Sequence, residues 1–253
     1  MGDELHLFGL QVEGQQIKLA CCSKLNITIT ILQIYNSFFM LNTKDLQLYL
    51  VTDRDLLRGR DLQDVVLEAV AGGVTMVQLR EKHAATRDFV ALARQLKSLL
   101  APKNIPLIIN DRIDVALAVD ADGVHVGQSD MPYAIARQLL GENKIIGLSV
   151  ENFDDIRVAN QLDVDYVGIS PVFATPTKND TAAPFGLEGL REAVKLSVHP
   201  TVAIGGMNES TIGEVMRCGT DGVAVVSAIV AADNPRKASA LLSQIVQNNM
   251  KTK

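Results

Sequence analysis

Three side chains that could bind an anion, Gln78, Arg80 and Lys82, alternate within the heptapeptide MVQLREK. This segment begins like a buried strand and ends in charges. Side chains of an extended segment point alternately to opposite faces, so these three project to one side and Glu81 projects to the other. Arg supplies a planar fork of donors and Lys a mobile point charge, a combination suited to a diphosphate. The alternative is an ion pair of Arg80 with Glu81 or Asp53, and the alternation disfavours Glu81.

Two carboxylates follow two other apolar runs: Asp111 ends IIND, and Asp130 ends HVGQSD. Carboxylates at the ends of neighbouring strands repel each other unless a cation lies between them. Mg²⁺ takes hard oxygen ligands, commonly one or two carboxylates together with substrate phosphate oxygens and waters. The alternatives are that Asp111 pairs with Arg112 or caps the next helix, and that Asp130 caps the helix opening at Pro132. The spacing alone leaves both interpretations open.

Other candidate residues stand near the ends of further apolar runs. Asn110 can donate amide hydrogen bonds to a ligand, and Ser149 lies near the end of GLSV. The segment PVFATPTKNDTAAPFG carries Thr175, Thr177 and Lys178, and its length favours a binding loop over a plain connection.

Two residues with reactive side chains are expected to be structural. His125 in GVHV is interpreted as a packed core histidine rather than a base. Cys218 in MRCGT is expected to pack at a helix end, because no His or Lys stands beside it in the sequence to lower the pKa of its thiol.

The elements that must position these residues alternate regularly from Gln47 onward. Segments with apolar residues at helical spacing separate short apolar runs, and this pattern is typical of parallel strands covered by helices on both faces. Eight such units over about 200 residues predict a (β/α)8 TIM barrel. An open doubly wound sheet is the alternative, but its glycine-rich first turn is replaced here by VTDRDLL. The expected strands are Leu48 to Thr52, Met76 to Leu79, Leu107 to Ile109, Gly123 to Val126, Ile145 to Val150, Tyr166 to Ile169, Thr201 to Ile204 and Gly222 to Val226.

In such a barrel the loops after strands seven and eight usually bind phosphate. Gly205 and Gly206 follow the seventh expected strand, and Val226 and Ser227 follow the eighth. Backbone N–H groups and a helix N-terminus could bind a dianion there, although a tight turn needs glycine in any case.

Residues 1–44 do not fit the alternation and are expected to be an extension of the barrel, which occupies residues 45–253. The apolar stretch from Leu25 to Leu41 resembles a signal-peptide core, but polar interruptions and the lack of a small-residue cleavage site argue against export, and it is too polar for a membrane span. One hypothesis is that the natural start is Met40. A structural cap or an interaction segment is the alternative.

Composition excludes several function classes. Hydrophobic residues make up 47% of the 253 residues and charged residues 21%, as in a globular enzyme. The net charge of -5 argues against a nucleic-acid surface. The 3 cysteines have no zinc-site or disulfide spacing, so a cytoplasmic location is expected. A homo-oligomer is compatible with the sequence, which does not decide the oligomeric state.

The ordered motifs QLREK, IIND, GVHVGQSD, GLSV, YVGISPVFATPTK, AIGG and VVSAI resemble the thiamine-phosphate synthase family from about Leu46 to Val246. The resemblance implies a transferase of thiamine biosynthesis. Such an enzyme couples 4-amino-2-methyl-5-hydroxymethylpyrimidine diphosphate to a thiazole phosphate, plain or carboxylated, and releases diphosphate.

The resemblance also implies roles for individual residues. Those that would bind the pyrimidine diphosphate are Gln78, Arg80, Lys82, Asn110, Ser149 and Lys178, with the three cations acting in catalysis. The Mg²⁺ ligands would be Asp111 and Asp130. The thiazole phosphate would be bound by Thr175, Thr177, Gly206, Val226 and Ser227.

Three rival functions are weighed against this one. A thiazole tautomerase should not need the two carboxylates or the strand-two cations, and this chain keeps both. A non-catalytic sensor of thiamine phosphates could lose the Mg²⁺ ligands, so the presence of Asp111 and Asp130 argues against it. A sugar-phosphate aldolase or epimerase is disfavoured because no Lys suited to a Schiff base stands out, Lys82 being better explained by diphosphate.

Overall fold

The computed structural model describes residues 12–13, 16–17, 41–174 and 183–250, and the chain divides into two units, Met1–Met40 and Leu41–Lys253. In the first unit, strands β1 (Val12–Glu13) and β2 (Gln16–Ile17) pair antiparallel. The second unit contains the barrel. It already includes residues 41–44, which were expected to belong to the extension, and most of the remaining extension lies outside the described residues.

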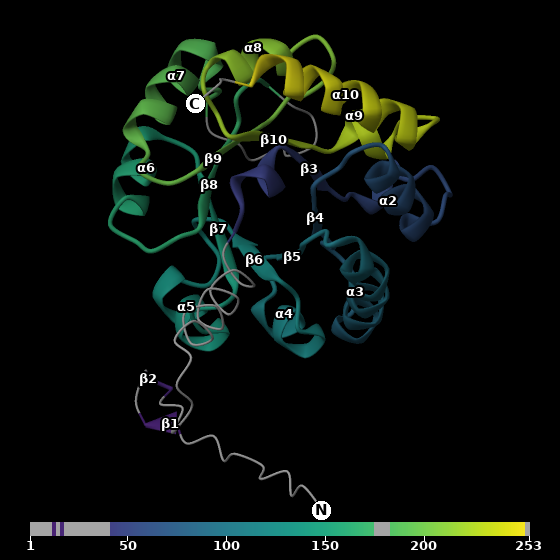
Figure 1. Ribbon diagram of the computed structural model, residues 1–253, viewed down its shortest axis with the longest axis vertical. Coiled ribbons are helices and arrows are strands. Elements are labelled where there is room, and N and C mark those ends of the chain that lie inside the picture. Colours follow the sequence, from purple (N-terminus) through teal and green to yellow (C-terminus); the bar gives the residue numbers. More distant parts are fainter. Residues whose placement is uncertain (1–11, 14–15, 18–40, 175–182, 251–253) are drawn as a thin grey trace, which may run out of the picture. The chain divides into compact units, whose positions relative to one another are not determined.

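Eight parallel strands of the described chain close into a barrel in the order β10-β3-β4-β5-β6-β7-β8-β9 (Figure 1). Pairing of β10 with β3 leaves no open edge, so the expected barrel is confirmed and the open sheet is excluded. Each expected strand is present within one residue of its expected bounds. The strands are β3 (Leu48–Val51), β4 (Met76–Leu79), β5 (Leu107–Asn110), β6 (Gly123–Val126), β7 (Ile145–Val150), β8 (Tyr166–Ile169), β9 (Thr201–Ile204) and β10 (Gly222–Val225).

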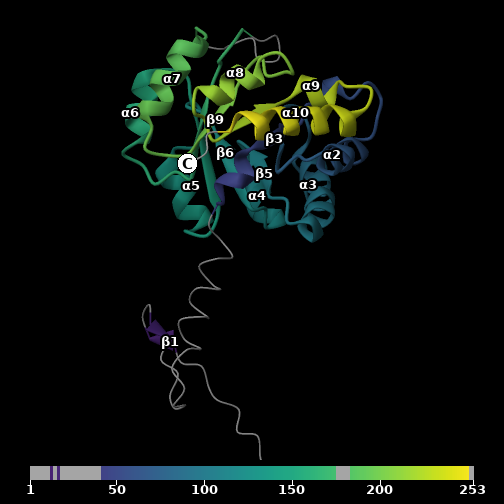
Figure 2. The ribbon, with the colours of Figure 1, turned by 45° about the horizontal axis from the view of Figure 1, so that its top comes forward.

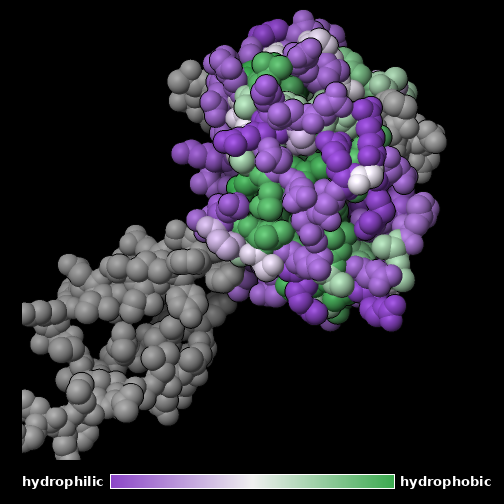
Figure 3. Space-filling view, turned by 90° about the vertical axis from the view of Figure 1, so that its right-hand side faces the viewer, coloured by the Kyte–Doolittle hydropathy of each residue, from purple (hydrophilic) through white to green (hydrophobic). Residues whose placement is uncertain are grey.

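Helices surround the strands (Figure 2), and they contribute buried apolar residues to the core. In α3, for example, Phe89, Ala93, Leu96 and Leu100 recur at helical spacing and are buried. The face of the barrel drawn in Figure 3 is largely hydrophilic, with groups of apolar side chains between the polar ones. The helices are α2 (Leu62–Ala71), α3 (Thr86–Leu100), α4 (Ile113–Val119), α5 (Tyr133–Leu140), α6 (Phe153–Ala159), α7 (Gly186–Leu196), α8 (Ile212–Arg217), α9 (Ser227–Val230) and α10 (Pro235–Asn249). None of the described helices has the length and apolar character needed to cross a membrane.

Within the described residues, three short 3-10 turns join these elements: η1 (Thr43–Leu46), η2 (Arg54–Leu56) and η3 (Ala101–Lys103). Turn η1 closes the N-terminal end of the barrel. Its Leu46 is fully buried in the cluster inside the barrel, with residues that begin the strands, such as Met76 and Ile145. The backbone of η1 approaches β10 so closely that a Cβ at Gly222 would lie 1.7 Å from the Leu46 carbonyl oxygen. Only glycine fits at that position.

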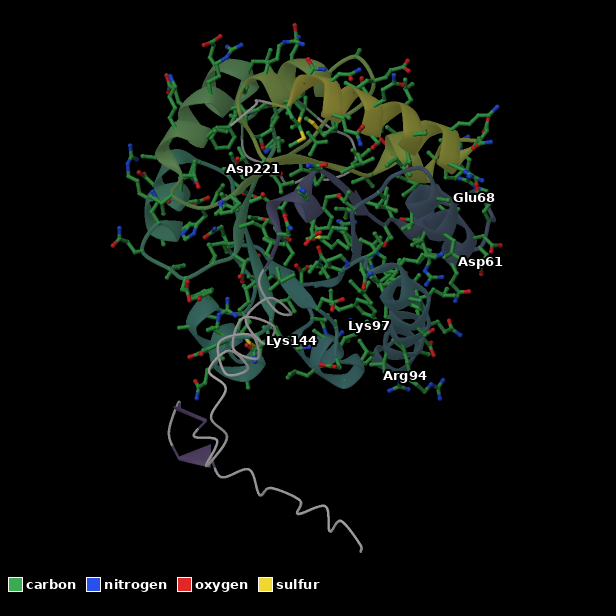
Figure 4. The ribbon with its side chains drawn as sticks, in the orientation of Figure 1. Asp61, Glu68, Arg94, Lys97, Lys144 and Asp221 are labelled. Atoms are coloured by element: carbon green, nitrogen blue, oxygen red, sulfur yellow. The ribbon has the colours of Figure 1, made fainter. Side chains whose placement is uncertain are left out.

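Four side chains of the described barrel repeat one contact, which we call the N-terminal clamp. The contact occurs in the four separate strand pairs β3/β4, β5/β6, β7/β8 and β9/β10. In each pair, the residue just before the second strand accepts a hydrogen bond from a backbone N–H at the start of the first strand. Asp221, labelled in Figure 4, is one of these residues. The clamps tie the N-terminal ends of the strands and leave the other rim to the connecting loops. The bonds run from Leu48 to Thr75 Oγ1 (3.0 Å), Leu107 to Asp122 Oδ2 (2.8 Å), Ile146 to Asp165 Oδ2 (2.8 Å) and Thr201 to Asp221 Oδ2 (2.9 Å).

One buried hydroxyl weakens the packing of α10 on α2. Ser239 is fully buried, and its Oγ has no hydrogen-bond partner among the described residues. An unsatisfied buried hydroxyl costs about 1–3 kcal/mol. We expect Ser239→Ala to raise the free energy of unfolding by about 1 kcal/mol in urea titrations, beyond any gain in helix propensity. Ser243→Ala, at a partly exposed site of the same helix, is the matched control. A gain no larger than that of Ser243→Ala would contradict the prediction.

Candidate active site

A cavity of about 730 Å³ opens at the C-terminal ends of the barrel strands. The site residues predicted from the sequence converge on it from six strands. Thr175, Thr177 and Lys178, also predicted, lie outside the described residues. The predicted residues that line the cavity are Gln78, Arg80, Lys82, Asn110, Asp111, Asp130, Ser149, Gly206, Val226 and Ser227.

Arg80 both lines the cavity and forms an ion pair with Asp53, 3.3 Å from Nη1 to Oδ2. An ion pair of Arg80 with Asp53 was the alternative to anion binding by Arg80. Arg80 forms this ion pair and still faces the cavity, so the ion pair does not prevent anion binding. The Asp53 carboxylate holds one edge of the guanidinium, while five N–H donors give the group capacity for a second anion. Glu81 points away, as the alternation predicted, and accepts two hydrogen bonds from Arg54 at 2.9 and 3.0 Å. Arg80 is therefore oriented from behind by the first βα loop.

The two carboxylates meet at the cavity rim. Burial and hydrogen bonding to the neighbouring Asp130 carboxyl raise the pKa of Asp111 to about 7, against the opposing effects of Asn110 and Arg80. Such a shift means that the pair holds a proton near neutral pH more readily than isolated carboxylates do, and that a nearby cation would stabilise its fully ionised form. The residue is also held with φ at 60°, a left-handed conformation in which Asp and Asn are the most tolerated non-glycine residues.

The competing structural roles for the two aspartates are wrong. Arg112 pairs with Asp114, 2.6 Å from Nη2 to Oδ2, and α4 has no side-chain cap. Asp130 accepts a hydrogen bond from the Gly127 N–H at 2.7 Å, and α5 likewise has no side-chain cap. Asp111 therefore neither pairs with Arg112 nor caps α4, and Asp130 does not cap α5.

The donor set at this rim fits Mg²⁺. No group of three or more His, Cys, Asp or Glu side chains in the described part of the chain could hold a metal by itself. Two carboxylates that repel each other beside an open cavity match the habit of Mg²⁺, which completes its octahedral shell with substrate oxygens and water. Asp111 and Asp130 are thus the residues that could hold it.

The loop after β9 takes a shape that only glycine allows. Gly205 and Gly206 have φ values of 104° and 72°, and both line the cavity. A Cβ on Gly205 would lie 2.9 Å from Pro171 Cβ, and one on Gly206 would lie 2.8 Å from Phe173 Cβ. The first residues after β10, Val226 and Ser227, line the same cavity. This end of the cavity is therefore built from closely approaching backbone.

The lining residues that were not predicted to bind substrate include Tyr49, His125 and Tyr166. These three residues connect Gln78 to Ser149 through an unbroken series of hydrogen bonds, which we call the cavity-floor chain. Burial raises the pKa of both tyrosines above their ordinary value, so the two phenols keep their protons at neutral pH. The contacts are Gln78 Nε2 to Tyr49 Oη (2.8 Å), Tyr49 Oη to Tyr166 Oη (2.9 Å), Tyr166 Oη to His125 Nδ1 (3.0 Å) and His125 Nε2 to Ser149 Oγ (2.8 Å).

Comparisons with known proteins agree with this geometry. Residues 48–229 match the family model described as thiamine monophosphate synthase. The chain is 57% identical over 201 residues to a thiamine-phosphate synthase of Albidiferax ferrireducens, covering 79% of this chain and 92% of that one. It is 54% identical over 198 residues to one of Vibrio campbellii, covering 78% and 96%. A solved structure of a thiamine phosphate pyrophosphorylase from Pyrococcus furiosus superposes with a TM-score of 0.76 at 40% identity, covering 83% of this chain and 99% of that one.

Proposed function

This chain belongs to the thiamine monophosphate synthase family, and we propose that it couples 4-amino-2-methyl-5-hydroxymethylpyrimidine diphosphate to a thiazole phosphate, plain or carboxylated. The products are thiamine phosphate and diphosphate, together with CO2 when the acceptor is the carboxylated thiazole phosphate. The observation that carries this proposal is that three features converge in one cavity. They are the carboxylate pair, the two cations of the β4 segment, and the glycine-shaped loop, which is the loop after β9 with Gly205 and Gly206.

The side of the cavity formed by β4, β5 and β7 suits the pyrimidine diphosphate. Arg80 and Lys82 face the cavity with positive charge, and Gln78, Asn110 and Ser149 add polar groups. Lys178, on the loop after β8, is proposed as a third cation. This set resembles the donor sites that proteins use for phosphate oxygens, in which charge-assisted hydrogen bonds dominate.

Asp111 and Asp130 are proposed to hold Mg²⁺ beside this group. When bound, the ion would supply positive charge close to the diphosphate oxygens. Burial, together with the neighbouring Asp130 carboxyl, raises the pKa of Asp111. This supports the assignment, because a divalent cation would stabilise the ionised pair.

The thiazole phosphate is proposed to bind at the opposite side, where Gly206, Val226 and Ser227 line the cavity. Thr175 and Thr177 are proposed to join them from the loop after β8. The absence of a Cβ at Gly206 allows a phosphate to approach the backbone closely.

In the proposed reaction the bond between the pyrimidine methylene carbon and the diphosphate oxygen breaks, and its electron pair leaves with diphosphate. The lone pair of the thiazole nitrogen then forms the new C–N bond to that carbon. Arg80 and Lys82 stabilise the negative charge that grows on the leaving group, and the two binding sites keep the reacting atoms in line. The step needs no protein nucleophile and no strong base.

An endpoint assay with both substrates tests the proposal. We expect purified protein to form thiamine phosphate, detected as its fluorescent thiochrome, with Mg²⁺ present and to form none in EDTA. Excess Mg²⁺ added after EDTA should restore the product. Equal product with and without EDTA would contradict the metal assignment, and no product from folded protein would contradict the proposed coupling.

A further inference from the structure

The cavity-floor chain crosses the inside of the barrel and joins two proposed substrate-binding residues. Its members come from five strands, β4, β3, β8, β6 and β7, in the order in which the hydrogen bonds run. Tyr49 and Tyr166 line the cavity but are at most 1% exposed, so their contacts are almost entirely shielded from water. The proposed function uses only the two ends of the chain, Gln78 and Ser149. The three central residues have no role in it so far.

Space for the chain is created by two glycines. A Cβ at Gly147 would lie 2.1 Å from Tyr166 Cζ and 2.5 Å from His125 Nδ1, on the hydrogen bond between these two side chains. A Cβ at Gly168 would lie 3.1 Å from His125 Cε1. The strands thus omit side chains at the points where the Tyr166 and His125 rings meet, as expected if the contact itself matters.

The first donor, together with the need of each phenol proton for an acceptor, gives one direction for every hydrogen bond of the chain. The Gln78 amide nitrogen can only donate, so the Tyr49 oxygen accepts from it. Each phenol has a single proton, and both protons find an acceptor within the chain only if Tyr49 donates to Tyr166 and Tyr166 donates to His125 Nδ1. The imidazole then carries its proton on Nε2 and donates to the Ser149 oxygen. The hydroxyl proton of Ser149 is left to point into the cavity.

We propose that Tyr49, Tyr166 and His125 are positioning residues that fix Ser149 as a hydrogen-bond donor toward an anionic substrate. The consequence for catalysis rests on the proposed function. A diphosphate accepts hydrogen bonds. If the Ser149 hydroxyl donated its proton to His125, its oxygen would face the diphosphate with lone pairs only and could not form a hydrogen bond with it. The chain therefore selects the one orientation that attracts the anion, and does so before the substrate binds, which is how preorganised donors contribute to rate.

The His125 tautomer can be read directly in the substrate-free protein. The chain has 4 histidines, and the spectrum of a His125→Gln variant identifies the His125 signals in protein labelled with ¹⁵N-histidine. We expect the wild-type ring to carry its proton on Nε2. In Tyr166→Phe the ring loses its donor, and both tautomers should be populated. Tyr49→Phe should shift the tautomer ratio in the same direction, although Tyr49 bonds to Tyr166 and not to His125.

Kinetics then separate positioning from general packing. We expect Tyr166→Phe to lower kcat about tenfold while the KM for thiazole phosphate stays unchanged, since one hydrogen bond in a polar network is worth about a factor of ten. Tyr133→Phe is the matched control: it also loses a phenol hydroxyl, which donates to the Asp163 carbonyl outside the cavity. It should keep wild-type kcat and the wild-type His125 tautomer.

Two results would overturn the proposal: a wild-type His125 protonated on Nδ1, or a Tyr166→Phe variant with the kcat and tautomer of Tyr133→Phe. If Tyr166→Phe did not fold, Tyr49→Phe would provide the same comparison. The tautomer is measured without substrates. An inactive wild-type protein would therefore disprove the proposed coupling and leave the test of the hydrogen-bond direction intact.

Discussion

Asp111→Asn is expected to lower kcat about 10³-fold at saturating Mg²⁺ and to make the metal-free protein more resistant to heat. Loss of one of two carboxylates removes the charge that would hold the ion, and removing one stabilising group at a reacting centre typically costs 10²–10³-fold. Asn also tolerates the left-handed backbone at this position, whereas Ala would add strain. Thiochrome kinetics would measure the first effect, and thermal unfolding in EDTA would measure the second.

The stability effect has a defined pH dependence. Because the pKa of Asp111 is raised in the folded state to about 7, ionisation favours the unfolded chain. The cost to the wild-type protein grows as the pH rises from the ordinary value of 3.8 and is complete above about 7. The Tm advantage of Asp111→Asn should therefore be larger at pH 8 than at pH 5.

Asp114→Asn provides the control for this variant, because it removes a carboxylate paired with Arg112 that does not line the cavity. Its kcat should equal that of the wild type. A kcat near the wild-type value in Asp111→Asn, or a Tm gain that did not depend on pH, would contradict the carboxylate-pair interpretation.

Lys82→Ala is expected to lower kcat/KM for the pyrimidine diphosphate between about 10- and 100-fold. A charge-assisted hydrogen bond to a phosphate oxygen is worth about 1.5–3 kcal/mol, and Arg80, held by Asp53, would retain part of the binding. The Kd for thiazole phosphate, measured by calorimetry, should not change, because Lys82 follows β4 and the glycine-shaped loop follows β9.

The matched control is Lys103→Ala in η3, an exposed lysine that does not line the cavity. Parallel losses for both substrates in Lys82→Ala would argue for a general disturbance of the rim. An effect equal to that of Lys103→Ala would show that Lys82 does not contact the diphosphate.

The barrel could be predicted because its strands are continuous apolar runs, a pattern that parallel sheets buried on both faces require. The positions of Arg80, Asn110 and Asp111 followed from the same reasoning, since polar residues directly after such runs meet at one rim. Local alternation also assigned Glu81 to the face away from the cavity, where it pairs with Arg54.

The cavity-floor chain could not be predicted from these patterns. A tyrosine within an apolar run is expected in a core, and nothing near Tyr49 in the sequence indicates that its partner is Tyr166, 117 residues away. His125 was interpreted as a packed core histidine from its place in the fourth expected strand. The structure shows it partly buried, with both ring nitrogens hydrogen-bonded at the floor of the cavity. Pairings across a barrel depend on closure, which no local pattern encodes.

Several expectations stay predictions because they concern the protein in its surroundings. These are the cytoplasmic location, the lack of a nucleic-acid partner, a homo-oligomeric state and Met40 as the natural start. The roles of Thr175, Thr177 and Lys178 also stay predictions.

The N-terminal clamps divide the barrel into quarters. The sequence does not show this division as a repeated residue, because one clamp uses Thr75 where the other three use aspartate. Each quarter consists of two strands with their helices, and its clamp joins residues within that quarter. The quarters meet in the short connections 101–106, 141–144 and 197–200. A break or a fusion point placed in any of these connections leaves both partners of every clamp on the same piece. In recombination between related barrels, a quarter is thus the unit that can be exchanged without breaking an N-terminal clamp.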